Sequence, residues 1–245
     1  MPHQLTPEEQ SPNGNDFLPG LALDFVVFGF HQNQLKILLL EYQNTNLFAL
    51  PGGFIRRDEN LNDAARRVLA ERTSLTDIYL EQFYIFGDLA RHDKAPLRAI
   101  MEAKGLAPTD DHWLLDRFVS VGYYALIDFT KAIPIPDPLS DTCDWYDLAT
   151  LPTLMLDHEA IVQKALDTLR TDLDRKLVGV TRWAAPLLAE TFTMADLQHL
   201  YETILGQPLR RSSFQRKILS LDIVERLDKK YSGGAHKAPF LYRFI

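Results

Sequence analysis

The side chains that could do chemistry gather in one stretch of the chain, Ala49–Leu75. Gly52 and Gly53 can turn the backbone tightly and leave room for a ligand. A loop at 54–60 comes next, and then a helix is predicted from about Leu61 to Thr73, with polar residues suited to its start. A glycine turn, a loop carrying a carboxylate and a charged helix are together typical of a catalytic loop followed by a catalytic helix.

Three positions of the predicted helix decide what chemistry it supports. Val68, Glu71 and Arg72 are spaced i, i+3 and i+4, so they share one face. A magnesium ion needs several oxygen ligands, and one carboxylate beside a guanidinium supplies too few and repels the ion. We therefore expect no metal, no cofactor and no catalytic residue. The plainer alternative is an amphipathic helix in which Arg67 and Glu71 form an i, i+4 pair, worth roughly 0.2 to 0.5 kcal/mol on a surface.

The stretch resembles the Nudix box, which runs Gly, five residues, Glu, seven residues, Arg-Glu-apolar-any-Glu-Glu-any-Gly-apolar. Gly53, Glu59 and Arg67 fall in register, whereas Val68 and Arg72 replace two metal-binding glutamates. The resemblance implies a retained scaffold with lost catalysis. The alternative is an active magnesium-dependent hydrolase of nucleoside diphosphate derivatives, which would assemble its metal from the remaining glutamates and groups elsewhere.

Strands are predicted on both sides of this stretch, and with the embedded helix they give a mixed α/β sandwich. The first two form a hairpin. The predicted strands are 21–30, 34–42, 47–50, 78–86, 118–128 and 144–151.

An insertion at Asp93–Leu115 is longer than a simple connection should be. Pro96 at a first helical position and Gly105 after Leu97–Lys104 predict a short helix inside it. A functional lid and a disordered insertion are both open here.

A helix from Asp157 to about Lys176 comes after the first unit. Asp157 is a good N-cap, and His158 is expected to make a local contact at the helix start rather than to act as a base. The helix is a natural bridge to the C-terminal unit, or a dimer surface.

The last quarter of the chain has the pattern of a winged helix-turn-helix, with three helices and a two-stranded wing. Thr193 should cap one helix, Gly206 should end it, and Ser212 or Ser213 should cap the next. The predicted helices are 183–188, 194–205 and 214–219, and the predicted strands are 223–227 and 240–244.

Basic residues fall where such a domain would meet DNA. From Val180 to Ile245 there are 10 Lys or Arg against 6 Asp or Glu, so this part carries about +4 while the whole chain is at −7. Lys and Arg supply affinity for phosphates, and Arg and Gln can read base edges. A protein-binding adaptor with a solvated basic face is the alternative. The candidate DNA-binding residues are Arg210, Arg211, Ser212, Ser213, Gln215, Arg216, Lys217, Lys229, Lys230 and Lys237.

Composition bounds the remaining possibilities. The chain has 245 residues, 46% of them hydrophobic, and its first 20 are polar, so we expect a loose tail rather than a signal peptide or membrane anchor, and a cytoplasmic protein. Cys143 is the single cysteine, and the histidines form no ligand-spaced cluster, so a structural zinc site is not expected.

Beyond the box, the whole of 20–245 is similar to the Nudix-related transcriptional regulators of the NrtR type, especially the bacterial subgroup that responds to sugars such as arabinose. Stretches that carry this resemblance include LALDFVVFGF, LPGGF, LPTLMLDHEAIVQKAL and LYETILGQPLRRSSFQRKI. It implies a homodimeric, ligand-responsive repressor of α/β (α+β) class, with an α/β/α sandwich for sensing and a winged helix for double-stranded DNA. The expected parts are a tail (1–20), a Nudix-like domain (21–155), a bridge helix (156–177) and a DNA-binding domain (178–245).

The effector is expected to be a sugar or an ADP-ribose-like nucleotide-sugar metabolite. Relatives usually carry a basic residue near the end of the second strand, where this chain has Glu41 and Tyr42, and this weakens the case for a phosphate-bearing ligand. The residues expected to orient or wall the effector are Phe54, Arg67, Glu71, Phe86, Asp88, Arg91 and Tyr123.

Overall fold

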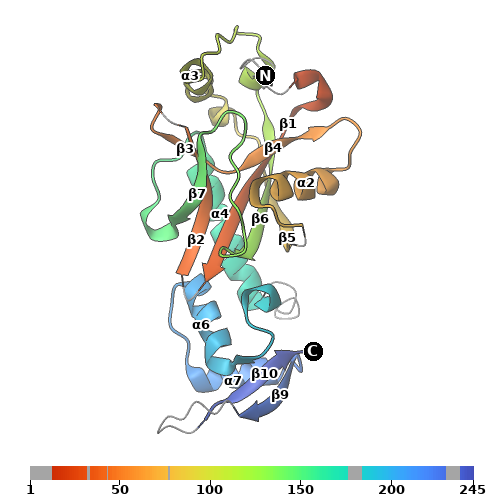
Figure 1. Cartoon of the computed structure of the whole chain (residues 1–245), viewed down its shortest axis with the longest axis vertical. Coiled ribbons are helices and arrows are strands. Elements are labelled where there is room, and N and C mark those ends of the chain that lie inside the picture. The colour runs from red at the N-terminus through yellow and green to blue at the C-terminus, as the bar shows by residue number, and fades with distance from the viewer. Residues whose placement is uncertain (1–12, 32–33, 43, 77, 176–183, 230–237) are drawn as a thin grey trace, which may run out of the picture. The chain divides into compact units, whose positions relative to one another are not determined.

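The computed structural model describes residues 13–31, 34–42, 44–76, 78–175, 184–229 and 238–245. The chain forms two compact units, the first comprising the chain up to Gly29 with Lys36–Leu166, and the second comprising Phe30–Leu35 with Asp167–Ile245 (Figure 1). No helix in the described ranges is long and apolar enough to cross a membrane.

Seven strands of the first unit's described residues form one sheet, in the order β3-β2-β1-β6-β5, with β4 paired to β1 and β7 paired to β2. Strand β1 begins earlier than expected, inside the predicted tail. The strands are β1 (Phe17–His31), β2 (Gln34–Tyr42), β3 (Leu47–Ala49), β4 (Gly52–Arg56), β5 (Leu80–Phe86), β6 (Val119–Asp128) and β7 (Thr142–Asp147).

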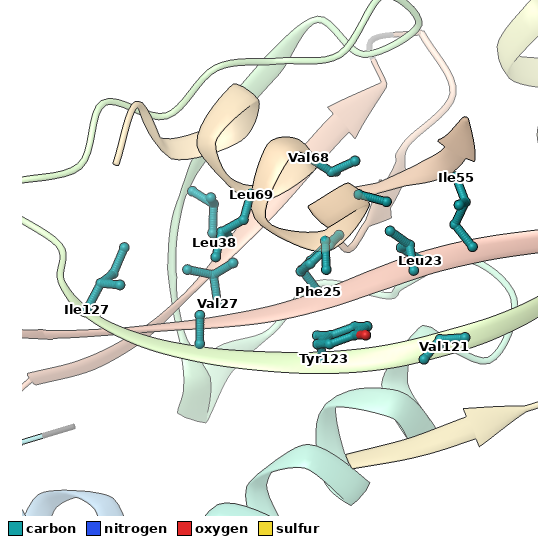
Figure 2. Close-up of a cluster of buried hydrophobic side chains, with 13 residues drawn as sticks. Leu23, Phe25, Val27, Leu38, Ile55, Val68, Leu69, Val121, Tyr123 and Ile127 are labelled. Carbon is teal, nitrogen blue, oxygen red and sulfur yellow. The ribbon is translucent and has the colours of Figure 1, made fainter. Parts of the chain in front are cut away.

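Helices cover both faces of this sheet, which gives the expected α/β/α sandwich. Helix α2 (Leu61–Thr73) lies in front of the strands in Figure 1, and α4 (His158–Arg175) begins behind them. Alternate residues of β1 and β6 point to α2, because side chains in a strand alternate between faces. Figure 2 shows Val68 and Leu69 of α2 packed in this core beside Phe25.

The glycine pair does not form the tight turn that the sequence suggested. Gly52 and Gly53 begin strand β4, and Gly53 pairs with Leu23 of β1. Both glycines are needed for close approach: a Cβ on Gly52 would lie 2.8 Å from the Leu23 carbonyl oxygen, and one on Gly53 would lie 2.7 Å from Val68 Cγ2. The strand and helix can therefore pack tightly only because these positions lack side chains.

The insertion contains the predicted short helix. Helix α3 (Ala95–Ala103) has Pro96 in its first turn, and Gly105 adopts φ +78° after it. Met101 packs with Leu114 and Leu115 of the short 3-10 helix at Trp113–Leu115. Further 3-10 turns of this unit lie at Gly14–Asp16, Leu89–Arg91 and Leu148–Thr150.

The second unit contains a helix-turn-helix beside a small sheet. As expected, Thr193 caps α6 (Met194–Leu205) through a capping box with Asp196, and Gly206 ends it at φ +69°. Helix α7 (Arg211–Leu219) begins three residues earlier than predicted.

Three details of the prediction for this unit are corrected. Arg210, not a serine, is the N-cap of α7, because the helix starts before Ser212. The wing is part of a three-stranded sheet, β8 (Phe192–Thr193), β10 (Phe240–Phe244) and β9 (Val224–Lys229), since Phe192 pairs with Tyr242. The helix predicted at 183–188 is a 3-10 turn at Ala185–Leu187 where it is described.

Candidate functional site

Arg67 holds the loop and helix of the box together. Its guanidinium donates to both Glu59 oxygens, at 2.6 and 3.0 Å, and to the Phe54 carbonyl oxygen at 2.9 Å. It also donates to Glu71 at 3.2 and 3.3 Å. The hydrogen bond from Arg67 is the main reason that the pKa of Glu59 is lowered and, in return, the pKa of Arg67 is raised. Both glutamates of the box, Glu59 and Glu71, are thus hydrogen-bonded to one arginine.

The residues of the box do not fit a magnesium ion. Val68 is 1% exposed and lies in the apolar core against Gly53, so this position turns its side chain away from solvent (Figure 2). The two remaining glutamates are engaged by Arg67. Among the described residues, no group of three or more His, Cys, Asp or Glu could hold a metal. Magnesium needs several oxygen ligands, and at the box positions only Glu59 and Glu71 supply carboxylates, both of them paired with Arg67.

A cavity of about 220 Å³ lies beside β4 and is lined by the middle of β1, the end of β2, the end of α2, the insertion and the start of α4. One part of its wall is apolar and aromatic, and the other part is polar. The apolar residues include Leu40, Leu97, Leu114, Met155, Phe54 and Phe118, and the polar residues are Asp24, Tyr42, Arg72, Arg91, Asp137 and His158.

Arg91 forms a buried ion cluster at this cavity. It donates to Asp24 Oδ2 at 3.2 Å and to the Phe86 carbonyl oxygen at 2.9 Å, and it lies 3.4 Å from Asp157 Oδ1. His158 is also buried, and its Nδ1 accepts a hydrogen bond from the Leu50 backbone N–H at 2.9 Å. Burial lowers the pKa of His158, which keeps the imidazole neutral and able to accept. The first residues of α4 are therefore fastened to the cavity wall.

A second polar group lines the cavity at the end of α2. Arg72 stands here with Tyr42 and Asp137. The Nε of Arg72 is buried and has no hydrogen-bond partner among the described residues. Burial raises the pKa of the Tyr42 hydroxyl. The charge of Asp137 raises this pKa further, whereas the charge of Arg72 lowers it. The electrostatic surroundings of Tyr42 thus include both charges.

The cavity contains only two of the residues expected to meet an effector, Phe54 and Arg91. The Phe54 ring meets Trp113 edge-on and lies tilted against Phe118, with ring centroids 4.8 and 5.4 Å apart. Tyr123 is 2% exposed in the core, where its hydroxyl donates to Asn62 at 3.1 Å.

The remaining expected residues lie elsewhere in the first unit. Arg67 and Glu71 form the network described above, Phe86 packs on Phe83 with ring centroids 5.8 Å apart, and Asp88 is exposed beside a 3-10 turn.

Sequence reasoning did not assign an effector role to several polar residues of the cavity. Arg72 gave a partial signal, since a charged residue had replaced a carboxylate of the box. His158 was expected to contact the helix start, but its partner, Leu50, lies 108 residues away in the sequence. No local pattern could identify such a pairing. The other polar cavity residues without an assigned effector role are Asp24, Tyr42 and Asp137.

Helix α7 presents a basic, solvent-exposed face. Phe214 and Ile218 are buried on its inner side, and Phe214 meets Tyr201 edge-on at 5.1 Å. The exposed polar residues of this helix and its N-cap are Arg210, Arg211, Ser212, Ser213, Arg216 and Lys217, with Gln215 half-buried between them.

The turn before α7 is fixed by side chains of α6. Glu202 accepts from the Leu209 backbone N–H at 2.8 Å and from the Gln198 amide at 2.8 Å. Gln198 in turn donates to the Leu209 carbonyl oxygen at 3.0 Å. These hydrogen bonds lower the pKa of Glu202. The angle at which α7 leaves the turn is thus set by a polar network.

Lys229 ends strand β9, where its ammonium lies 5.4 Å from the centre of the Phe240 ring. Arg226 covers the same ring at 4.5 Å. Lys230 and Lys237 lie outside the described residues. A helix-turn-helix with a basic exposed helix and an adjoining basic strand has the geometry of a winged-helix nucleic-acid interface.

Comparisons with known proteins agree with both units. The family model of the NrtR DNA-binding winged helix domain matches residues 184–244. The chain is 32% identical over 236 residues to the ADPR responsive transcriptional repressor NtrR of Acinetobacter baylyi, covering 92% of this chain and 82% of that protein.

Two solved structures are similar over nearly the whole chain. Shewanella oneidensis NrtR complexed with a 27mer DNA has a TM-score of 0.65 and 28% identity, covering 92% of this chain and 93% of that one. A MutT/nudix family protein from Enterococcus faecalis has a TM-score of 0.63 and 21% identity, covering 97% and 91%, and is similar in fold alone.

Proposed function

The chain belongs to the NrtR family of Nudix-related transcriptional regulators, and we propose that it represses transcription in response to a small metabolite held in the cavity of its Nudix-like unit. The observation that carries this proposal is the state of the box. Val68 is packed into the core, and the acidic side chains are bound by Arg67, yet the cavity beside the box keeps charged groups. The unit is thereby suited to hold a ligand without cleaving it.

Two effectors are proposed, an ADP-ribose-like metabolite and a free sugar. The first is supported by the Acinetobacter baylyi relative, which is ADPR responsive. The second is supported by the charges in the cavity, where Asp24 and Asp137 accompany Arg72 and Arg91. Such a wall has no excess of positive charge with which to attract a diphosphate. We propose Phe54 and Arg91 as effector contacts, and Arg67 and Glu71 as the support of the loop beside them.

The start of α4 offers a route from the cavity to the DNA-binding unit. Asp157 and His158 are tied to Arg91 and Leu50 at the cavity wall, and the helix continues along the chain into the second unit. A ligand changes DNA affinity only if it binds one arrangement of the protein better than another. We propose that the effector does so by shifting Arg91, and α4 with it.

The DNA-reading part is proposed to be the winged helix, with α7 in the major groove and Lys229 near the backbone. We propose 21–155 as the sensing domain, 156–177 as the bridge and 178–245 as the DNA-binding domain of a cytoplasmic homodimer. A charge of about +4 on the last quarter of the chain is modest, and a dimer doubles the phosphate contacts.

The test is DNA binding by the full chain, measured by fluorescence anisotropy on a duplex selected from a random library. We expect affinity to weaken steeply with salt and to change when ADP-ribose or a pentose is added. Gln215→Ala should relax the sequence preference, while Lys217→Ala should weaken binding to all sequences alike. The absence of any preference for one duplex sequence over another, at every salt concentration, would count against a DNA reader and favour a protein-binding adaptor.

Catalysis is tested separately on the same preparation. Incubation with magnesium and ADP-ribose should give no turnover above that of a heat-treated sample. Sustained magnesium-dependent hydrolysis that Glu71→Gln abolishes would establish an active Nudix hydrolase and refute this part of the proposal.

A further inference from the structure

Three polar residues that converge on the effector cavity come from separate parts of the first unit. Arg72 is in the last turn of α2, Tyr42 ends β2, and Asp137 lies after β6 in the connection to β7. Backbone hydrogen bonds bring two of them together, because Ile135 N–H donates to the Arg72 carbonyl oxygen at 2.9 Å and the nearby Ile133 N–H donates to that of Thr73 at 3.0 Å. The segment that carries Asp137 is thus attached to the end of α2.

Each of the three side chains keeps hydrogen-bonding capacity that the described residues do not use. Arg72 makes no ion pair with them, and its buried Nε has no acceptor. Asp137 Oδ1 accepts from the backbone of Leu139 and Ser140 at 2.8 and 2.7 Å, which leaves its second oxygen free among the described residues. Tyr42 is 8% exposed, and its hydroxyl makes no hydrogen bond to the same part of the chain. Buried polar groups of native proteins are almost always paired, so the unpaired Nε of Arg72 favours a polar occupant of this cavity.

The chemistry of the group points to neutral hydroxyls. A guanidinium donates, a carboxylate accepts, and a phenol does both, so together they match adjacent hydroxyls, which also donate and accept. The two charges of Arg72 and Asp137 offset each other. A phosphate in the same place would gain little net attraction, because Asp137 and Asp24 offset the charges of Arg72 and Arg91.

We propose that Arg72, Asp137 and Tyr42 recognise the vicinal hydroxyls of a sugar ring, so that Arg72 binds ligand at the position where the Nudix box has a metal-binding glutamate. This assignment rests on the proposed function, since it names the chemical group that the cavity recognises. A vicinal diol occurs both in a free pentose and in the riboses of ADP-ribose, and the experiment separates these sources.

The experiment is calorimetric titration of the full chain with D-ribose, L-arabinose, 2-deoxy-D-ribose and ADP-ribose. The variants are Arg72→Gln, Asp137→Asn and Tyr42→Phe, and the matched control is Arg66→Gln, an exposed arginine on the same helix. Unliganded melting temperature is measured for each. Tyr42→Phe keeps the ring and removes only the hydroxyl, so it still tests the assignment if a charge variant fails to fold.

For whichever probe binds, Arg72→Gln and Asp137→Asn should weaken binding roughly 10- to 100-fold, since each replaces a charged hydrogen-bonding group with a neutral one. Tyr42→Phe should weaken it about 3- to 10-fold, and Arg66→Gln should leave it unchanged within twofold. 2-Deoxy-D-ribose, which lacks the 2-hydroxyl and the vicinal pairs that it forms, should bind more weakly than D-ribose if free pentoses bind. Whether ADP-ribose or a pentose binds decides the source of the ring.

Two results overturn the assignment while the proposed function stands. One is binding of a probe that all three variants retain. The other is loss of ADP-ribose binding in Arg72→Gln together with tighter binding in Asp137→Asn, which would show that the group binds phosphate. If no probe binds the unchanged chain in calorimetry and none alters its DNA affinity, the proposed effectors and the assignment both fail.

Discussion

Replacing Arg67 with methionine tests whether the box now serves structure rather than chemistry. The change keeps much of the side chain's apolar length but removes every donor. It leaves the Phe54 carbonyl oxygen without its 2.9 Å partner and leaves Glu59 with only the Arg56 backbone N–H at 2.7 Å. We expect the first unit to lose stability.

The size of the loss depends on how exposed the ion pairs are. The Arg67 and Glu59 side chains are 22% and 15% exposed, whereas Glu71 is 43% exposed. Exposed pairs contribute about 0 to 1 kcal/mol, and breaking a buried pair costs about 3 to 5 kcal/mol. The Glu59 pair lies between these limits and the Glu71 pair adds little, so we expect a loss of roughly 2 to 3 kcal/mol. For a protein of this size that lowers the melting temperature by about 4 to 12 °C.

The assay is urea unfolding monitored by circular dichroism, with Arg66→Met as the control. Arg66 lies on the same helix, and its side chain is 69% exposed beside Asp63. Its loss should change stability by less than about 0.5 kcal/mol. The reasoning is refuted if Arg67→Met is as stable as Arg66→Met. If in addition effector affinity fell, Arg67 would bind ligand, as the sequence suggested.

Other contacts of the two units give three more expected outcomes. The stability difference between the unchanged chain and Arg67→Met should shrink in urea titrations as the pH falls below about 4.5. The reason is that the folded-state pKa of Glu59 is lowered, and such a carboxyl stabilises fully only above its unfolded pKa. A constant difference down to pH 3 would contradict this. Val68→Glu should destabilise by at least about 3 kcal/mol and, with Arg72→Glu added, give no magnesium-dependent turnover, since a carboxylate there is buried against Gly53; stable, active protein would show that the box can be restored. Phe214→Ala should destabilise the second unit by about 3 to 5 kcal/mol in thermal melts, whereas Arg216→Ala should change the melting temperature little and weaken DNA binding; equal melting temperatures would show that Phe214 does not anchor α7.

Elements with strong local signals could be predicted from the sequence. Helix α2 runs over the predicted Leu61–Thr73, and α6 runs from its Thr193 cap to Gly206 as expected. Strand β10 also has its predicted limits, Phe240–Phe244. In each case apolar periodicity and end signals agree, and no distant contact is needed to fix the boundary.

The misplaced features depend on distant contacts. Two adjacent glycines are compatible with a turn or with close packing, and only the neighbours Leu23 and Val68 decide for packing. Several polar residues of the cavity were missed for the same reason, because Arg72 and Asp137 are brought together by hydrogen bonds between the end of α2 and a segment far along the chain.

The contact between Val68 and Gly53 also bears on how such a protein can evolve. Regaining a metal site takes carboxylates at both altered positions of the box, and neither substitution helps alone. A carboxylate gained first at position 68 would strain the core before it could share an ion. One gained first at Arg72 would, on our assignment, remove a ligand contact and disturb regulation. Both routes therefore begin with a loss, the first of core stability and the second of ligand binding, and each loss opposes the return of a metal site.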